Sequence, residues 1–268
     1  MTTNDEIADR LQKAAVAAVQ LTAARVGTPL SKIGGLPDLP QQFEWPAWKG
    51  SPLAFLAQIE LGSVPALHSL TDLPRTGMLY FLYNQKQSTW GFDPADRGSW
   101  RVIYLAASQD LATATPPEGL SKKAIYKQKP VEPRQINSYP SFERLYVDLR
   151  SVPDEAFEIE EELRSEATGD EPEHQIGGFP NPVQGDEMER ESQLVSNGIY
   201  CGDPSGYQDP RAAELEDGVA DWKLLLQVDT DDDTGMMWGD GGRLYFWIRT
   251  GDLASNDFSN VWMVLQCH

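Results

Sequence analysis

The sequence predicts an α+β protein with a β-rich core, made of two similar antiparallel or mixed sheets within one body. Two observations carry this prediction. Short apolar runs are bounded by glycine, proline and aspartate, and several sequence blocks recur in the same order in the two halves of the chain. Hydrophobic residues make up 40% of the 268 residues, which is enough for a substantial core.

The first expected element is a helix over residues 4–26, within an N-terminal segment of residues 1–28. Apolar residues recur there at helical spacing, alanine is abundant, and Asn4 or Asp5 suits the cap position. Gly27 and Pro29 end the pattern. We interpret the apolar stripe as a packing face, because a membrane-surface helix would carry more basic residues.

Apolar runs of strand length follow in both halves of the chain. Residues 112–140 between them are rich in proline, which indicates an extended connection with room for one strand. The predicted strands are 53–61, 78–83 and 100–105 in the first half and 224–228, 243–248 and 262–265 in the second.

Helical patterns return after the first set of strands. Pro153 lies near the start of a pattern over 153–167, and Gly169 lies just beyond its end. Two shorter helices are expected at 189–196 and 211–216.

The recurring blocks predict an internal duplication. Ile33-Gly-Gly-Leu-Pro37 returns as Ile176-Gly-Gly-Phe-Pro180, and a Gly-x-Leu-Tyr-Phe block at 77–81 returns at 242–246. Gln58 and Gln227 occupy matching strand positions, where a buried amide must form hydrogen bonds and so can tie its strand to a neighbouring turn. Short apolar runs resemble each other by chance, but ordered recurrence that includes glycines, a proline and a glutamine does not arise so easily.

The duplication divides the chain into three expected parts. Residues 1–28 form the N-terminal helix, 29–150 the first β-rich repeat with its proline-rich connection, and 151–268 an acidic helix with the second repeat. The two repeats are expected to share one core as a single pseudo-symmetric domain.

Several blocks of the second half resemble the YwqG-like family of bacterial proteins of unknown function. The most specific is Met237-Trp-Gly-Asp240, followed by Leu-Tyr-Phe at 244–246. The others are Ile176–Pro180, Gln184 with Asp186, Gln193–Gly198 and Leu224–Asp229. The resemblance runs from about Ser31 to the C-terminus. It implies a β-rich duplicated fold, a cytoplasmic location and a possible protective role beside toxin and immunity genes, but no reaction, cofactor or catalytic residue.

The loop after the strand at 224–228 is the most conspicuous candidate site. Asp229, Asp231, Asp233 and Asp240 are spaced like the ligands of a calcium loop. The sixth place is Thr234 where such a loop has glycine, the last ligand is aspartate where it has glutamate, and strands flank the loop. Two interpretations remain: a weak divalent-cation site, or an acidic turn whose glycines supply positive φ angles.

A polar ligand pocket is the second candidate. It would be lined by Gln227, Asp229, Trp238 and Asp240, with His174 and Gln184 nearby. In the structural alternative, Asp240 accepts backbone N–H groups in an Asx-turn while Trp238 packs over the core.

Charge limits the partners of the protein. Residues 151–240 hold 25 of the 41 acidic residues and four of the 22 basic ones, a net charge of −21 against +2 elsewhere. Such a field disfavours nucleic acid and anionic membrane and favours cations or a basic protein. The alternative is a surface that only maintains solubility.

Recognised catalytic motifs are missing from the sequence, including nucleotide-binding glycine loops, the nucleophile elbow and the zinc-protease motif. The acidic N-terminus lacks the features of a signal peptide, and two cysteines without metal-type spacing favour a cytoplasmic protein. No cofactor is predicted. A noncatalytic binding or protective module is therefore the preferred function, and a small-molecule hydrolase with carboxylates around Asp229, Asp240 and His174 is the alternative.

Overall fold

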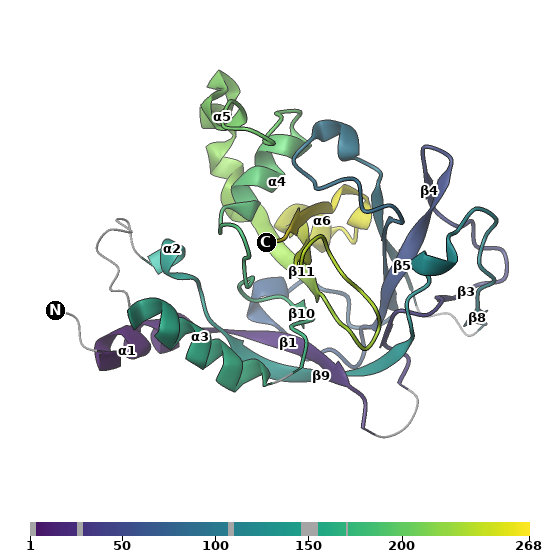
Figure 1. The fold of residues 1–268 in the computed structure, drawn as a ribbon, viewed down its shortest axis with the longest axis horizontal. Coiled ribbons are helices and arrows are strands. Elements are labelled where there is room, and N and C mark those ends of the chain that lie inside the picture. Colours follow the sequence, from purple (N-terminus) through teal and green to yellow (C-terminus); the bar gives the residue numbers. More distant parts are fainter. Residues whose placement is uncertain (1–3, 26–28, 107–109, 146–154, 170) are drawn as a thin grey trace.

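A computed structural model describes residues 4–25, 29–106, 110–145, 155–169 and 171–268 (Figure 1). The α-helices are α1 (Asn4–Ala14), α2 (Phe142–Leu145), α3 (Glu155–Thr168), α4 (Met188–Ser196), α5 (Pro210–Leu215) and α6 (Thr250–Ala254). The expected boundaries near 28 and 150, and the helix start at Pro153, lie outside these ranges.

The longer strands are β1 (Val16–Ala23), β5 (Ser51–Glu60), β6 (Met78–Asn84), β7 (Trp100–Leu105), β9 (Lys129–Ser138), β11 (Trp222–Asp229), β12 (Arg243–Arg249) and β13 (Trp262–Gln266). The short strands are β2 (Lys32–Ile33), β3 (Asp38–Leu39), β4 (Ala47–Trp48), β8 (Ala112–Thr113) and β10 (Gln175–Ile176). All six strands predicted from apolar runs are confirmed, as are the helices that correspond to α3, α4 and α5.

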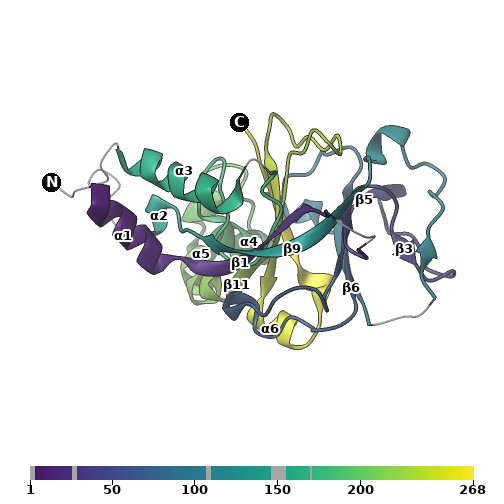
Figure 2. The same cartoon turned by 90° about the horizontal axis from the view of Figure 1, so that it is seen from below.

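Both halves of the chain contribute to one 11-stranded antiparallel sheet. Its order is β13-β12-β11-β10-β1-β9-β2-β5-β6-β7, with β4 attached to β5, and a separate two-stranded sheet joins β3 to β8. The β-rich prediction is confirmed, but the two expected sheets are joined into one by the central pair β1 and β9. Figure 2 shows these two strands running between the helices at one end and β3 at the other.

The expected helix over 4–26 is wrong beyond residue 14. Residues 16–23 form β1, which pairs along its whole length with β9 and also contacts β10. Gln20 on this strand is fully buried and donates a hydrogen bond to the carbonyl of Thr168 at 3.0 Å. Alanine favours a helix by only about 0.7 kcal/mol per residue at most, so a strand position hydrogen-bonded on both sides outweighs it.

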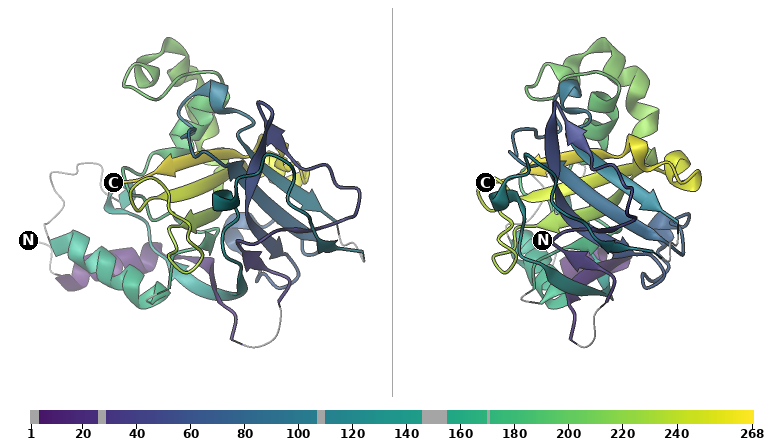
Figure 3. Two further views of the ribbon diagram at one scale, coloured as in Figure 1. Left: turned by 45° about the vertical axis from the view of Figure 1, so that its right-hand side comes forward. Right: turned by 90° about the vertical axis from the view of Figure 1, so that its right-hand side faces the viewer.

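The two arms of the sheet lie close together (Figure 3). Aromatic side chains pack between them. One arm is β5-β6-β7 and the other is β11-β12-β13. Phe81 of β6 meets Phe246 of β12 edge to face, with ring centroids 5.2 Å apart, and Trp100 meets Trp262 at 4.9 Å. Edge-to-face contacts of this kind add about 0.5–1.5 kcal/mol beyond area burial. The main core therefore lies between the arms.

Helices α1, α2 and α3 form a smaller core of their own at one end of the molecule (Figures 1 and 2). Ile7 and Leu11 of α1 are buried against Phe142, Ala156 and Leu163. Ile7 and Leu11 are four positions apart, so they lie on one helix face. This packing positions α3 beside β9, where the helix borders the cleft described next.

Candidate functional site

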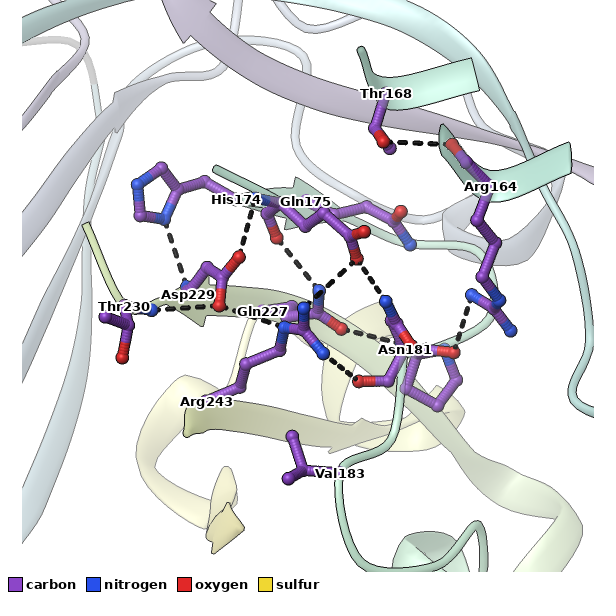
Figure 4. A network of polar contacts seen from close by, with 12 residues as sticks. Arg164, Thr168, His174, Gln175, Asn181, Val183, Gln227, Asp229, Thr230 and Arg243 are labelled. Carbon is purple, nitrogen blue, oxygen red and sulfur yellow. Dashed lines mark hydrogen bonds and ion pairs between the residues drawn. The ribbon is translucent and has the colours of Figure 1, made fainter. Parts of the chain in front are cut away.

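A buried polar network lies where β10, β11 and β12 meet the segment 179–185 (Figure 4). Gln227, in the middle of β11, is its fully buried centre. Its amide oxygen accepts the N–H of Asn181 at 2.9 Å, and its amide nitrogen donates to the carbonyl of Glu173 at 2.9 Å. Both kinds of hydrogen-bonding group are satisfied, as burial of an amide requires.

Asp229, at the end of β11, is surrounded by donors. Its carboxylate accepts the N–H groups of Glu173 and Thr230, each at 2.9 Å, and the Nε–H of Arg243 at 2.9 Å. The Arg243 guanidinium also donates to the carbonyl of Asn181 at 3.1 Å. A carboxylate with three donors, one of them charged, is held in one orientation.

His174 connects this network to the aspartate loop. Its Nδ1 accepts the N–H of Asp229 at 3.1 Å, so the ring proton lies on Nε2, which faces Asp231 Oδ2 at 3.3 Å. Nε2 therefore donates to Asp231, and both side chains are 1% exposed. Burial raises the pKa of the Asp231 carboxyl, but the hydrogen bond from His174 and the nearby Lys129 charge outweigh burial and hold the pKa at about 2.

Lys129 supplies the positive charge at the aspartate loop. Its Nζ lies 3.3 Å from Asp233, 3.5 Å from Asp231 and 3.6 Å from Glu171. Asp231 also accepts the N–H of Asp233 at 2.9 Å, so the Asx-turn expected at Asp240 is formed by Asp231. Asp240 is an exposed residue whose carbonyl accepts the N–H of His268 at 3.3 Å.

The four carboxylates proposed as cation ligands do not converge. Asp229 faces Arg243, Asp231 and Asp233 face Lys129, and Asp240 lies apart at the surface. Within the described ranges, no three His, Cys, Asp or Glu side chains are grouped so as to hold a metal ion.

Trp238 is fully buried under the same loop. Its Nε1 donates to the carbonyl of Asp229 at 3.1 Å, and its ring meets Tyr83 and Tyr126 edge to face, with centroid distances of 6.2 and 5.7 Å. The side chain therefore connects the loop to both halves of the chain and is not exposed to solvent.

An open cleft of about 640 Å³ lies beside the network, between α3 and the segment 181–185. Glu173, Asn181 and Arg243 form its boundary with the network, and the exposed Gln184 lies on its lining. The α3 side chains that line it include Phe157, Glu160, Glu161 and Arg164. Of the predicted binding residues, only Gln184 lines the cleft. Gln227 and Asp229 lie behind the boundary residues, and His174, Trp238 and Asp240 lie farther away along the loop.

Sequence reasoning missed Asn181 and Arg243, and it treated the α3 glutamates as part of the acidic surface without placing them at this cleft. Asn181 carried a usable signal, because it follows the second Gly-Gly-Phe-Pro block directly, as Asp38 follows the first Gly-Gly-Leu-Pro block. The α3 residues carried none, because only tertiary packing brings this helix to the network.

The first arm contains a matching set of hydrogen bonds. Gln58 Oε1 accepts the N–H of Asp38 at 2.8 Å, and Gln58 Nε2 donates to the carbonyl of Leu30 at 2.7 Å. Tyr80 donates to the carbonyl of Asp38 at 2.7 Å, as Tyr245 does to the carbonyl of Asn181 at 2.7 Å.

Backbone irregularities match as well. The pairing register shifts between Phe55 and Ala57 in β5 and between Leu224 and Leu226 in β11. These bulges place Leu56 and Leu225, which match in the sequence repeat, at the same irregular position. The paired glycines have positive φ in both halves, at 68° and 75° for Gly34 and Gly35 and at 66° and 73° for Gly177 and Gly178.

None of the helices in the described ranges combines the length and apolar character that a membrane span requires. No curated protein matches the chain. A family model described as a domain of unknown function, DUF1963, matches residues 31–267, which include both arms, the polar network and the cleft. By this match over most of its length, the chain belongs to the DUF1963 family.

Proposed function

We propose that the chain is a noncatalytic binding module, with a protective or immunity-like role, that engages a basic protein through its acidic surface. The observation that supports this most is a contrast within the second half. The polar side chains of the network are buried and paired, whereas the carboxylates on the outer face of α3 are exposed and without a bonding partner in the described ranges.

The hydrolase alternative has no comparable support. General acid–base chemistry needs a carboxylate or imidazole within hydrogen-bond reach of substrate or water. Asp229 and His174 do not line the cleft, and their polar atoms are engaged with backbone N–H groups, Arg243 and Asp231. Opening this network would leave buried polar groups unpaired, each at a penalty of about 1–3 kcal/mol.

Helix α3 carries a repulsive charge pattern that a basic partner would relieve. Glu158 and Glu162 are four residues apart, as are Glu162 and Glu166, and all three are exposed. Like charges at this spacing destabilise a helix by about 0.2–0.5 kcal/mol per pair. Glu155 and Glu161 add two further exposed carboxylates. A cationic partner would remove the repulsion and be attracted by the field of the acidic region.

A pull-down from a lysate of the source organism tests the proposal. At low salt the wild-type bait should recover proteins of high isoelectric point, and these should be lost at about 1 M salt, where the Debye length is about 3 Å. The triple variant Glu158→Gln, Glu161→Gln, Glu162→Gln should lose them at low salt.

The control bait is Glu44→Gln, Asp72→Asn, Glu118→Gln, which neutralises three exposed carboxylates of the first half. It should behave like the wild type. Equal recovery with all three baits, or recovered proteins no more basic than the lysate, would contradict the proposal and leave the acidity as a solvation feature.

We also infer that the two β-rich units arose by internal duplication. The matched glutamine hydrogen bonds, tyrosine hydrogen bonds, bulges and positive-φ glycine pairs all support this inference. In the sheet order, β9-β2-β5-β6-β7 mirrors β1-β10-β11-β12-β13. In this scheme β1 begins the first unit, with β2, β5, β6 and β7, and β9 begins the second, with β10, β11, β12 and β13. The first strand of each unit pairs with the short strand of the other unit: β1 with β10, and β9 with β2.

The resemblance to the YwqG-like family, with its bacterial and cytoplasmic members, supports placing the protein in the cytoplasm as part of the same proposal. Cys201 and Cys267 are both free thiols and both buried, which suits a reducing compartment.

A further inference from the structure

We propose that the cleft beside α3 is the specificity site of this binding module and receives an arginine side chain of the basic partner. This inference rests on the proposed function, since it assumes a basic protein partner. It adds the position of the contact and the type of side chain that is recognised.

The outer wall of the cleft pairs an aromatic ring with a carboxylate. Phe157 is 60% exposed, although its ring meets that of Phe142 in an edge-to-face contact with centroids 5.9 Å apart. Glu161 lies four residues later on α3 and therefore on the same face, and it too is exposed. Both side chains line the cleft. Exposure of a large apolar ring to water is unfavourable. A ring beside a carboxylate is a suitable binding site for a cationic side chain.

The opposite wall and the boundary with the network have complementary properties. Pro182 and Val183 provide an apolar surface for the methylene groups of a long side chain. Glu173 is 19% exposed at the boundary, where one of its carboxylate oxygens accepts the amide of Asn181 at 2.6 Å. Glu173 and Glu161 therefore offer carboxylate oxygens on two sides of the cleft.

The positive charges that line the cleft are already neutralised. Arg164 donates to Glu160 at 3.0 Å and to the carbonyls of Tyr139 and Pro180 at 2.7 and 3.3 Å. Arg243 is shared between Asp229 at 2.9 Å and Glu173 at 3.8 Å. Two guanidinium groups thus face Glu160, Glu173 and Asp229, and Glu161 adds a further charge. The cleft keeps a net negative charge, which fits a cation and disfavours an anionic ligand.

Arginine fits this arrangement better than lysine. Its guanidinium is planar, so it can stack on the face of Phe157 while its N–H fork reaches the Glu161 carboxylate in a bidentate contact. Lysine presents a more strongly hydrated point charge and would gain less from the ring. The structure therefore predicts that the site distinguishes two side chains of the same charge.

The test measures binding of a fluorescein-labelled peptide of alternating arginine and glycine, with a lysine–glycine peptide of the same length as its comparison. Fluorescence anisotropy at low salt should show tighter binding of the arginine peptide to the wild-type protein. Glu161→Lys should weaken that binding about tenfold, and Phe157→Ser should weaken it at least about fivefold while abolishing the preference for arginine.

Two matched controls keep the test specific. Glu214→Lys makes the same charge change at another exposed helical glutamate, on α5, and Tyr200→Ser removes another exposed aromatic, which is 46% exposed. Each should change affinity by less than about twofold. Thermal melts of all four variants identify any loss of binding that comes from unfolding.

The outcomes separate the two proposals. Equal weakening by Glu161→Lys and Glu214→Lys, without a preference for arginine, would overturn the cleft and leave a diffuse acidic binding surface. Failure of the wild-type protein to bind either peptide at low salt would overturn the cleft and also count against the basic partner itself.

Discussion

Replacement of Glu191 by glutamine should stabilise the protein at neutral and alkaline pH. Glu191 lies on α4, where one carboxylate oxygen accepts the hydroxyl of Tyr207 at 3.0 Å. The other oxygen is buried without a hydrogen-bond partner in the described ranges. Burial is the largest influence on this group. Together with the charges of Glu187 and Glu189, it raises the pKa to about 7 against the opposing effect of the Tyr207 hydrogen bond.

The sign of the effect follows from proton linkage. The pKa is 4.5 in the unfolded chain and about 7 in the folded protein, so the folded state holds its proton more tightly. As pH rises from about 4.5 to 7, the unfolded chain ionises first and the folded state loses relative stability. Above pH 7 the penalty is complete. At about 1.4 kcal/mol per pKa unit it amounts to roughly 3 kcal/mol, a large part of a typical total of about 5–15 kcal/mol.

Urea unfolding of wild type and Glu191→Gln at pH 4, 6 and 8 measures this penalty. The two proteins should agree within about 0.5 kcal/mol at pH 4, and the variant should gain up to roughly 3 kcal/mol at pH 8. Glu187→Gln, an exposed neighbour just before the same helix, should shift stability by less than about 0.5 kcal/mol at either pH. A difference between Glu191→Gln and wild type that does not vary with pH would refute the reasoning.

Three further predictions concern the polar network and the aspartate loop. Asp231→Asn should destabilise the protein by roughly 2–3 kcal/mol, since it removes the buried carboxylate charge that His174 and Lys129 stabilise, and Lys129 keeps only the more exposed Asp233 and Glu171. In the wild type, the stabilisation by the Asp231 carboxylate should be present above pH 3.8 and lost as pH falls towards the Asp231 pKa of about 2. Acid unfolding of the wild type and the variant would therefore show a difference in stability that shrinks over this pH range. Gln58→Leu and Gln227→Leu should each lower the free energy of unfolding by about 2–4 kcal/mol, because each leaves one backbone N–H and one backbone carbonyl unpaired. Urea unfolding measures both losses, and strongly unequal values would count against the duplication. Millimolar calcium should leave the thermal melt unchanged because Asp231 and Asp233 already pair with Lys129 and the loop carboxylates do not converge. A calcium-dependent rise in melting temperature that Asp231→Asn abolishes would contradict this prediction.

Most regular elements were predictable because their signals are local. The apolar runs that became β6, β12 and β13 are almost entirely buried, and their lengths, with the glycines that precede β6 and β12, are visible in the sequence. The recurring Ile-Gly-Gly blocks also predicted that the two halves resemble each other, and their glycines do have matching positive φ angles. Such features depend on the backbone of a few neighbouring residues and so are contained in the sequence itself.

Tertiary contacts determined the secondary structure of the N-terminal segment and the joining of the two expected sheets into one. Residues 16–23 have helical composition, yet they form β1 because β9 and β10 offer hydrogen bonds on both sides. These partners lie more than a hundred residues away, so no local pattern reports them. The same central pairing joins two expected sheets into one.

The candidate site was also predictable only in part from the sequence. The sequence alone identified the residues of the aspartate loop and the buried glutamine, but it said nothing about which of them face solvent. Folding placed Lys129 among the aspartates, turned His174 towards Asp231, and brought α3 alongside Asn181 and Arg243. A carboxylate becomes a fixed structural partner or an accessible binding group according to its burial and its nearest charges, and both are set by contacts between distant parts of the chain.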